Sequence, residues 1–169
     1  YEPYALTRDQ EIAKLLNGLG IGFHHFKDQV IFEKSEVMKD DGRPYTVFTP
    51  YRNKWRSILR DEDLAAFPCR LSRDKIVQTT VPYPLPSLEA LGFLSTGFVY
   101  QPPEIDESVL KQYYQTRDIP SLTGTSMLSP HLRFGTISIR ELSAVALRNS
   151  DKFFDELIWR EFYQYLLWH

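Results

Sequence analysis

The chain has 169 residues, 43% hydrophobic and 14% aromatic, which is enough for one or two compact domains with a core. Its formal net charge of −2 excludes a globally basic protein, so a nucleic-acid partner would need a local basic face. The single cysteine, Cys69, excludes an internal disulfide and is typical of a reducing compartment. The sequence contains no apolar run of the roughly 18 residues that span a membrane and opens with no signal peptide, so we expect a cytoplasmic protein.

The first 50 residues have the pattern of the end of an α/β unit. Residues 7–17 predict an amphipathic helix that Thr7 caps and Gly18 ends. The β-branched and aromatic residues of 21–33 then predict short strands. A helix that runs into strands is typical of α/β architecture.

A second helix start is predicted within residues 47–59. Thr49 has the position of an N-cap, and Pro50 follows at the first helical position. Trp55, Ile58 and Leu59 share one face of this helix, and core packing is the simplest interpretation of that stripe.

Periodicity fades between residues 66 and 103, where most of the 11 prolines lie, and the pattern is helical again from residue 105. We therefore expect a mixed, mostly α fold. It comprises an α/β remnant over residues 1–50, a long irregular connector with one helix over 51–104, and the opening helices of an all-α domain over 105–169. A helical pattern that continues to His169 predicts a piece of a longer protein.

One stretch rich in hydroxyl groups precedes a predicted helix at Pro130. It contains Thr123, Thr125, Ser126 and Ser129, together with Gly124. Hydroxyls beside the free N–H groups of a helix N-terminus suit a phosphate. The alternative is purely structural, with Ser129 as an N-cap and the other hydroxyls in a turn.

The closing helix predicts a second site. Glu156, Trp159, Arg160 and Tyr163 are spaced three, four and seven positions apart and share one face. Glu156 and Arg160 would form a surface ion pair in the simpler interpretation. In the functional one, Trp159 offers a stacking plane for a flat ligand beside a carboxylate and a guanidinium. The opposite, core-facing side would consist of Phe154, Leu157, Ile158 and Phe162.

Other polar residues carry weaker signals. His24 and His25 are adjacent and would face opposite sides of a strand, so we expect them to be structural and predict no metal site. Cys69 lacks a nearby base and is expected to be inert. Arg117 is either a surface charge or a phosphate contact.

Four stretches of this sequence together resemble the DNA photolyase/cryptochrome family. They are YEPYALTRD at 1–9, VFTPYRNKW at 47–55, TRDIPSLTGTSMLSPHLRFGTISIREL at 116–142 and ELIWREFYQYLLWH at 156–169. The resemblance implies the end of an α/β antenna domain, a connector, and the truncated start of a helical FAD-binding domain.

The resemblance also implies a flavin site. Thr125, Ser126, Leu128 and Ser129 match the segment that binds the FAD phosphates, and Tyr113 matches a tyrosine near them. Met127 stands where the family usually has arginine, so one charge-assisted contact is lost while the backbone N–H remains. Arg160 would lie near the flavin or the DNA lesion.

For DNA, the resemblance implies that Arg117 contacts the backbone of UV-damaged DNA. Glu156 would hydrogen-bond a flipped pyrimidine dimer, Trp159 would stack on it, and Arg160 and Tyr163 would line the cavity. Glu2 would lie near an antenna chromophore such as a folate or a deazaflavin.

The implied activity of the longer protein is light-driven repair of cyclobutane pyrimidine dimers by electron transfer from reduced FAD. The alternative is a cryptochrome-type blue-light photoreceptor. The sequence predicts no oligomeric state, and we expect the isolated chain to be an inactive structural piece because part of the flavin site is missing.

Overall fold

The computed structural model describes residues 2–67, 72–76, 78–79, 81 and 83–169. Cys69, predicted to be inert, lies outside the described residues. The chain divides into two units, which we treat separately. One consists of Tyr1–Ala66 with Pro103–His169, and the other is Phe67–Pro102.

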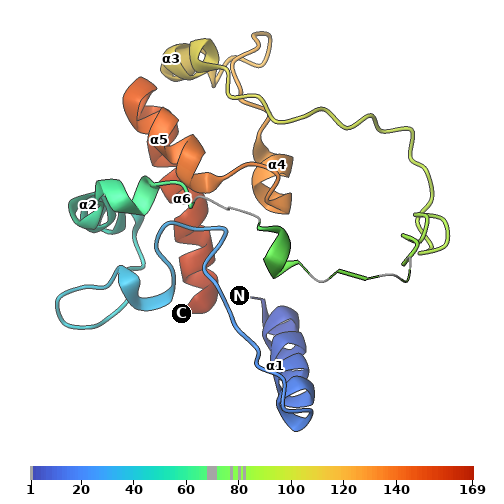
Figure 1. Cartoon of the computed structure of the whole chain (residues 1–169). Coiled ribbons are helices and arrows are strands. Elements are labelled where there is room, and N and C mark those ends of the chain that lie inside the picture. The colour runs from blue at the N-terminus through green and yellow to red at the C-terminus, as the bar shows by residue number, and fades with distance from the viewer. Residues whose placement is uncertain (1, 68–71, 77, 80, 82) are drawn as a thin grey trace. The chain divides into compact units, whose positions relative to one another are not determined.

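The described residues form six α-helices, and no strand is assigned among them. The helices are α1 (Pro3–Gly18), α2 (Phe48–Ile58), α3 (Glu107–Thr116), α4 (Ser129–Phe134), α5 (Ile139–Asn149) and α6 (Asp151–Trp168) (Figure 1). Short 3₁₀ helices occur at Lys34–Glu36, Asp61–Leu64 and Arg73–Lys75. The predicted mostly α fold is confirmed.

The strands predicted within residues 21–33 do not form. This segment is irregular, although Val30, Ile31 and Phe32 are buried. A strand needs a neighbouring strand to pair its backbone groups. Here the N–H groups of Ile31 and Phe32 instead donate to the side-chain carboxylate of Glu161 on α6, at 2.7 and 3.0 Å.

Two predicted helix starts were placed too late. α1 begins at Pro3, so Thr7 lies inside the helix and does not cap it, because a proline in the first turn already favours helical geometry there. α2 begins at Phe48 with Val47 as its N-cap, which places Thr49 within the first turn.

Side-chain caps start α3, α5 and α6. Asp106 accepts from the backbone of Ser108 at α3, Ser138 caps α5, and Ser150 accepts from the N–H of Phe153 at α6. Each cap pairs a backbone N–H that would otherwise lack a partner, which stabilises a helix by about 1 kcal/mol.

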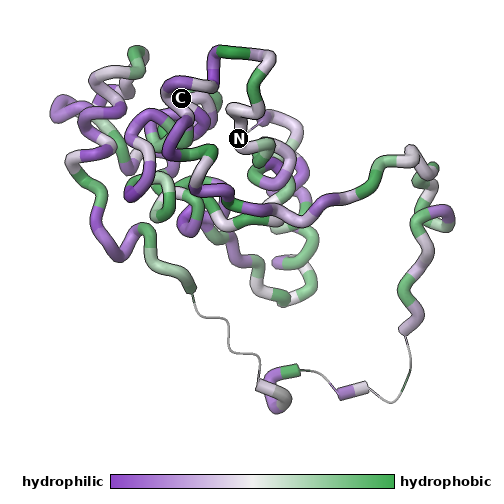
Figure 2. Tube along the Cα trace, turned by 90° about the horizontal axis from the view of Figure 1, so that it is seen from above, coloured by the Kyte–Doolittle hydropathy of each residue, from purple (hydrophilic) through white to green (hydrophobic). Residues whose placement is uncertain are grey.

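Helix α6 is the centre of the first unit and contacts α2, α3 and α5; α5 lies beside it in Figure 1. The predicted core face is confirmed, because Phe154, Leu157, Ile158 and Phe162 are all buried. Facing them are buried residues of the other helices, namely Tyr51 and Trp55 of α2, Leu110 of α3, and Leu142 and Ala146 of α5. Figure 2 shows hydrophobic and hydrophilic residues interspersed along the coiled parts of the chain.

The second unit has little regular structure in its described part, as its lack of periodicity predicts. Apart from Arg73–Lys75 it holds only turns, such as the one that ends at Gly92 with φ of 87°. Its described apolar side chains are exposed, Leu85 at 95% and Leu94 at 88%.

Candidate functional site

The C-terminal end of α3 meets α6 through a pair of opposite charges. The guanidinium of Arg117 donates to the carboxylate of Glu156, and its Nε donates to Asp118 at 3.1 Å. Lys152, one turn earlier on α6, lies 3.1 Å from the same carboxylate. The carboxylate of Glu156 and then that of Asp118 raise the pKa of Arg117 above its ordinary value. Arg117 is therefore a fixed cation, with its side chain still 26% exposed.

Tyr113 lies one turn before Arg117, and the guanidinium sits 5.5 Å from the centre of its ring. The ring also packs edge-on against Phe153, with centroids 5.0 Å apart. Burial, and next the negative charge of Glu156, raises the pKa of Tyr113. The phenol therefore stays protonated and can serve as a hydrogen-bond donor.

The hydroxyl-rich segment, residues 123–129, lies against the end of α3. Gly124 is buried, and a Cβ at this position would lie 2.5 Å from the carbonyl oxygen of Thr116. Only a glycine permits this approach. The segment therefore meets α3 at Thr116, the residue that precedes Arg117 in the sequence.

Within this segment the side chains differ in exposure. Leu128 is buried, Ser126 is half-buried, and Thr125 and Ser129 are exposed. The hydroxyl of Thr125 lies 3.5 Å from the sulfur of Met127, whose backbone is left-handed with φ of 53°. The predicted flavin-phosphate residues are thus contiguous on one surface segment, with Leu128 anchoring it in the core.

The structural alternative for Ser129 is wrong. Leu128 is the N-cap of α4, no side chain caps this helix, and Ser129 is already its first residue. Pro130 stands in the first turn, as predicted, and is compatible with a helix that begins one residue earlier. Within the described part of the chain the hydroxyls of Ser126 and Ser129 make no hydrogen bond, so they are available to a ligand.

Three nearly parallel rings form what we call the aromatic platform, consisting of Phe48, Trp159 and Tyr163. The rings of Phe48 and Trp159 stack at 3.7 Å with an interplanar angle of 11°. Trp159 and Tyr163 follow at 5.7 Å and 26°. Tyr163 is 60% exposed and Trp159 is half-buried, so the platform reaches the surface.

Arg160 does not pair with Glu156, so the simple surface pair predicted for these two residues is wrong. Its guanidinium donates to the carbonyl oxygen of Gln29 at 2.6 Å and to that of Leu132 at 3.1 Å. Burial lowers the pKa of Arg160. Arg160 therefore links α6 to the 21–33 segment and to α4.

Glu2, the predicted antenna contact, lies exposed just before α1, where its carbonyl accepts the N–H of Leu6 at 3.1 Å. Its carboxylate makes no hydrogen bond or ion pair among the described residues. His25 packs edge-on against Phe23 at 4.5 Å. No group of three metal-binding side chains occurs where the chain is described, and no described helix could cross a membrane.

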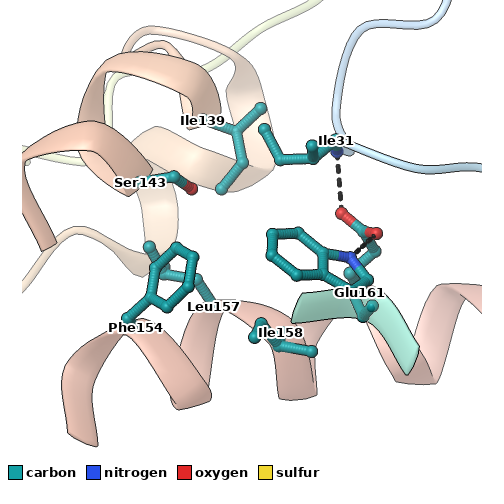
Figure 3. A pocket seen from close by; sticks show the side chains of 8 residues that line it. Ile31, Ile139, Ser143, Phe154, Leu157, Ile158 and Glu161 are labelled. Carbon is teal, nitrogen blue, oxygen red and sulfur yellow. Dashed lines mark hydrogen bonds between the residues drawn. The ribbon is translucent and has the colours of Figure 1, made fainter. Parts of the chain in front are cut away.

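Glu161 is the polar residue that sequence reasoning missed. It is 3% exposed and accepts hydrogen bonds from the N–H groups of Ile31 and Phe32 and from the indole N–H of Trp55. Figure 3 shows the bonds from Ile31 and from the indole. Burial raises the pKa of Glu161 to about 7, against the lowering effect of these donors. Its position three residues after Ile158, on the predicted core face, is the signal that could have revealed it.

The carboxylate of Glu161 borders a small apolar pocket (Figure 3). Its other lining residues are Ile31, Trp55, Ile139, Ser143, Phe154, Leu157 and Ile158. The space between them does not admit a water molecule, so this part of the core is packed and is no ligand site.

Comparisons with known proteins define the class to which this arrangement belongs. Residues 1–70 match the model of the DNA photolyase family. The structure superposes on a bacterial class III photolyase from Agrobacterium tumefaciens with a TM-score of 0.77 and 25% identity, covering 100% of this chain and 39% of that one. The chain is thus similar to members of the DNA photolyase family, in sequence over residues 1–70 and in fold over its whole length.

Several relatives found by sequence comparison are named photo-lyases. The chain is 32% identical over 99% of its length to a deoxyribodipyrimidine photo-lyase of Synechococcus sp. (strain ATCC 27144), and covers 40% of it. It is 31% identical over 99% of its length to that of Escherichia coli K12, covering 38%. The chain is also 33% identical over 95% of its length to an uncharacterized protein of Synechococcus sp. (strain PCC 6716), and covers 64% of that protein. The chain thus spans about two fifths of the photolyase relatives.

Proposed function

We propose that the protein to which this chain belongs repairs cyclobutane pyrimidine dimers in UV-damaged DNA in a light-dependent reaction. The observation that carries the proposal is the arrangement on α6, where Glu156 pairs with Arg117 and lies on the same helix face as Trp159 and Tyr163. The relatives' name, deoxyribodipyrimidine photo-lyase, favours repair over a photoreceptor function.

The residues on α6 suit a flipped lesion. A dimer inside a duplex is inaccessible and must leave the stack, where a weakly stacked lesion costs less to extract. Trp159 and Tyr163 offer surfaces on which a flat base can stack. The carboxylate of Glu156 can accept a hydrogen bond from the imide N–H of a pyrimidine, and its side chain is 28% exposed.

Arg117 suits a DNA phosphate. Its guanidinium is held by two carboxylates yet remains partly exposed, and its unused N–H groups can donate to a phosphate oxygen. Such contacts position the duplex and carry no sequence information. With a net charge of −2 for the chain, a local cation of this kind is what a nucleic-acid interface requires.

The hydroxyl-rich segment fits the diphosphate of FAD by the chemistry of its donors. The hydroxyls of Ser126 and Ser129 make no hydrogen bond within the described part of the chain. Tyr113, in the last turn of α3, offers a protonated phenol. Thr125 and the backbone of Met127 and Leu128 would complete the set. When bound, reduced FAD would supply light-driven electron donation. Arg160 would fix the position of α6 at the edge of the site through its hydrogen bonds to two backbone carbonyls.

We further propose a domain assignment for the chain. Residues 1–50 would be the C-terminal end of an α/β photolyase domain, residues 51–104 the connector between two domains, and residues 105–169 the start of the FAD-binding domain. Glu2 would then contact a folate or deazaflavin antenna. The role of Glu2 is tested by measuring how much antenna chromophore the full-length wild-type protein and the Glu2→Ala variant each bind. We expect the variant to bind less.

The main test is light-dependent dimer splitting by the flavin-loaded full-length protein on a dimer-containing oligonucleotide. We expect repair to fall at least about tenfold in Glu156→Ala and in Trp159→Ala, and to stay unchanged in Glu107→Ala, an exposed α3 residue. A flavin-loaded protein that splits no dimer in light would overturn the proposal.

A further inference from the structure

The aromatic platform contains one residue, Phe48, to which no function has been assigned. Phe48 is the first residue of α2, and its ring lies face to face with Trp159 at 3.7 Å and 11°. That separation is close contact between two ring planes, so nothing else fits between them. One face of the Trp159 indole is therefore covered by Phe48.

Phe48 is itself anchored in the core. Its ring meets Phe162 at 5.8 Å and 61°, and Phe162 is 3% exposed. Phe162 in turn packs on Tyr51 at 4.9 Å. Trp159 also meets Phe162, edge to face, at 5.9 Å. The plane of Trp159 is thus set by Phe48 of α2 and by Phe162 on the core side of α6, and Tyr163 is a third ring neighbour at 5.7 Å.

Hydrogen bonding does not orient Trp159. Among the described residues its indole N–H donates to no partner, in contrast to Trp55, whose N–H donates to Glu161. The orientation of the Trp159 ring therefore depends on aromatic packing, and the face-to-face contact with Phe48 has the shortest centroid separation of its ring contacts, which lie at 3.7, 5.7 and 5.9 Å.

We propose that Phe48 is a positioning residue for lesion recognition: it covers one face of Trp159 and fixes the tilt of the other face, on which a flipped pyrimidine stacks. The inference rests on the proposed function, because it assigns Phe48 a role only if Trp159 contacts the lesion. Phe48 touches Trp159 and would not touch the DNA.

The test compares the affinity of the flavin-loaded full-length protein for a duplex with one thymine dimer and for the same duplex undamaged. In Phe48→Leu, which keeps apolar volume but removes the ring plane, we expect the ratio of the two affinities to fall about 3–10-fold. Phe48→Tyr, which keeps the ring, should restore the ratio. Phe26→Leu makes the same change at a ring that is 86% exposed and should leave it unchanged.

A structural role alone would lower the melting temperature of Phe48→Leu without changing the ratio, and that result would overturn the inference. If Phe48→Leu does not fold, Phe48→Met serves instead, since an unbranched side chain fills the space without providing a plane. Trp159→Ala separates the two proposals. A ratio that falls in Trp159→Ala but not in Phe48→Leu overturns the inference alone. An unchanged ratio in Trp159→Ala overturns the inference and the proposed role of Trp159, whereas the proposed repair activity fails only if the wild-type protein splits no dimer in light.

Discussion

The guanidinium of Arg117, just after α3, donates a hydrogen bond to the carboxylate of Glu156 on α6, 39 residues further along the chain. Two residues that the sequence predicts to contact DNA are therefore bound to each other. This pair joins two helices of the candidate site and gives each residue a structural role besides the proposed functional one.

A double-mutant cycle should measure that role. With Arg117→Ala, Glu156→Ala and the double variant, we expect a coupling free energy of about 0.5–1 kcal/mol in urea unfolding, because both side chains are partly exposed. The coupling should shrink at high salt. The exposed Glu107–Lys111 pair on α3 is the control, and a coupling no larger than its roughly 0.2–0.5 kcal/mol would contradict this prediction.

Glu161 should make stability depend on pH. Its pKa in the folded protein is about 7, above the ordinary 4.5, so the folded state holds the proton more tightly than the unfolded state. The resulting stabilisation is fully present below pH 4.5 and is lost as pH rises through 7.

Glu161→Gln isolates this effect, because the amide does not titrate. We expect the free energy of unfolding of the wild type, relative to the variant, to fall by roughly 1–3 kcal/mol between pH 5 and 8 in urea titrations. A difference that is constant over this range would show that Glu161 does not titrate there.

Gly124→Ala should displace the hydroxyl-rich segment from α3. The added Cβ would lie 2.5 Å from a backbone oxygen, which cannot move aside as the end of a side chain can. We expect a loss of about 1–3 kcal/mol in stability and a lower flavin content of the full-length protein. Gly18→Ala, where no atom lies within 4 Å of the added Cβ, should be neutral or stabilising. Equal effects at the two glycines would refute the packing argument.

Asp155 should stabilise the contact between α2 and α6. Its carboxylate accepts from Arg52 at 3.0 Å and from Arg56 at 2.8 Å, and only 16% of its side chain is exposed. Asp155→Ala leaves both guanidinium groups without this partner, so we expect a cost of about 1–3 kcal/mol by chemical denaturation. Asp40→Ala removes a carboxylate that is 96% exposed and also pairs with α2, through Lys54, and should cost less than about 0.5 kcal/mol.

The helices after residue 105 could be predicted because their signals are local. Asp106, Ser138 and Ser150 are caps at positions that short-range pattern identifies, and the apolar face of α6 follows the 3.6-residue period. Local signals of this kind do not decide whether residues 21–33 form strands. β-Branched and aromatic residues favour a strand, but a strand also needs a partner strand, which the local sequence does not specify.

The candidate site was predicted only in part, for a similar reason. Spacing places Glu156, Trp159 and Tyr163 on one helix face, and they do lie there. It cannot show that Arg117 is the partner of Glu156, or that Phe48 lies on Trp159, because both contacts join distant parts of the chain. Their roles in binding remain predictions.

The bonds from Ile31 and Phe32 to Glu161 also bear on the order of events during translation. The donors and the acceptor are 130 and 129 residues apart. At 5–20 residues per second, a ribosome needs on the order of ten seconds to add that much chain. For that interval the N–H groups of Ile31 and Phe32 lack the carboxylate that accepts their hydrogen bonds. The nascent chain therefore carries an apolar segment whose backbone partner is synthesised much later, and a chaperone that binds this segment would protect it until α6 emerges.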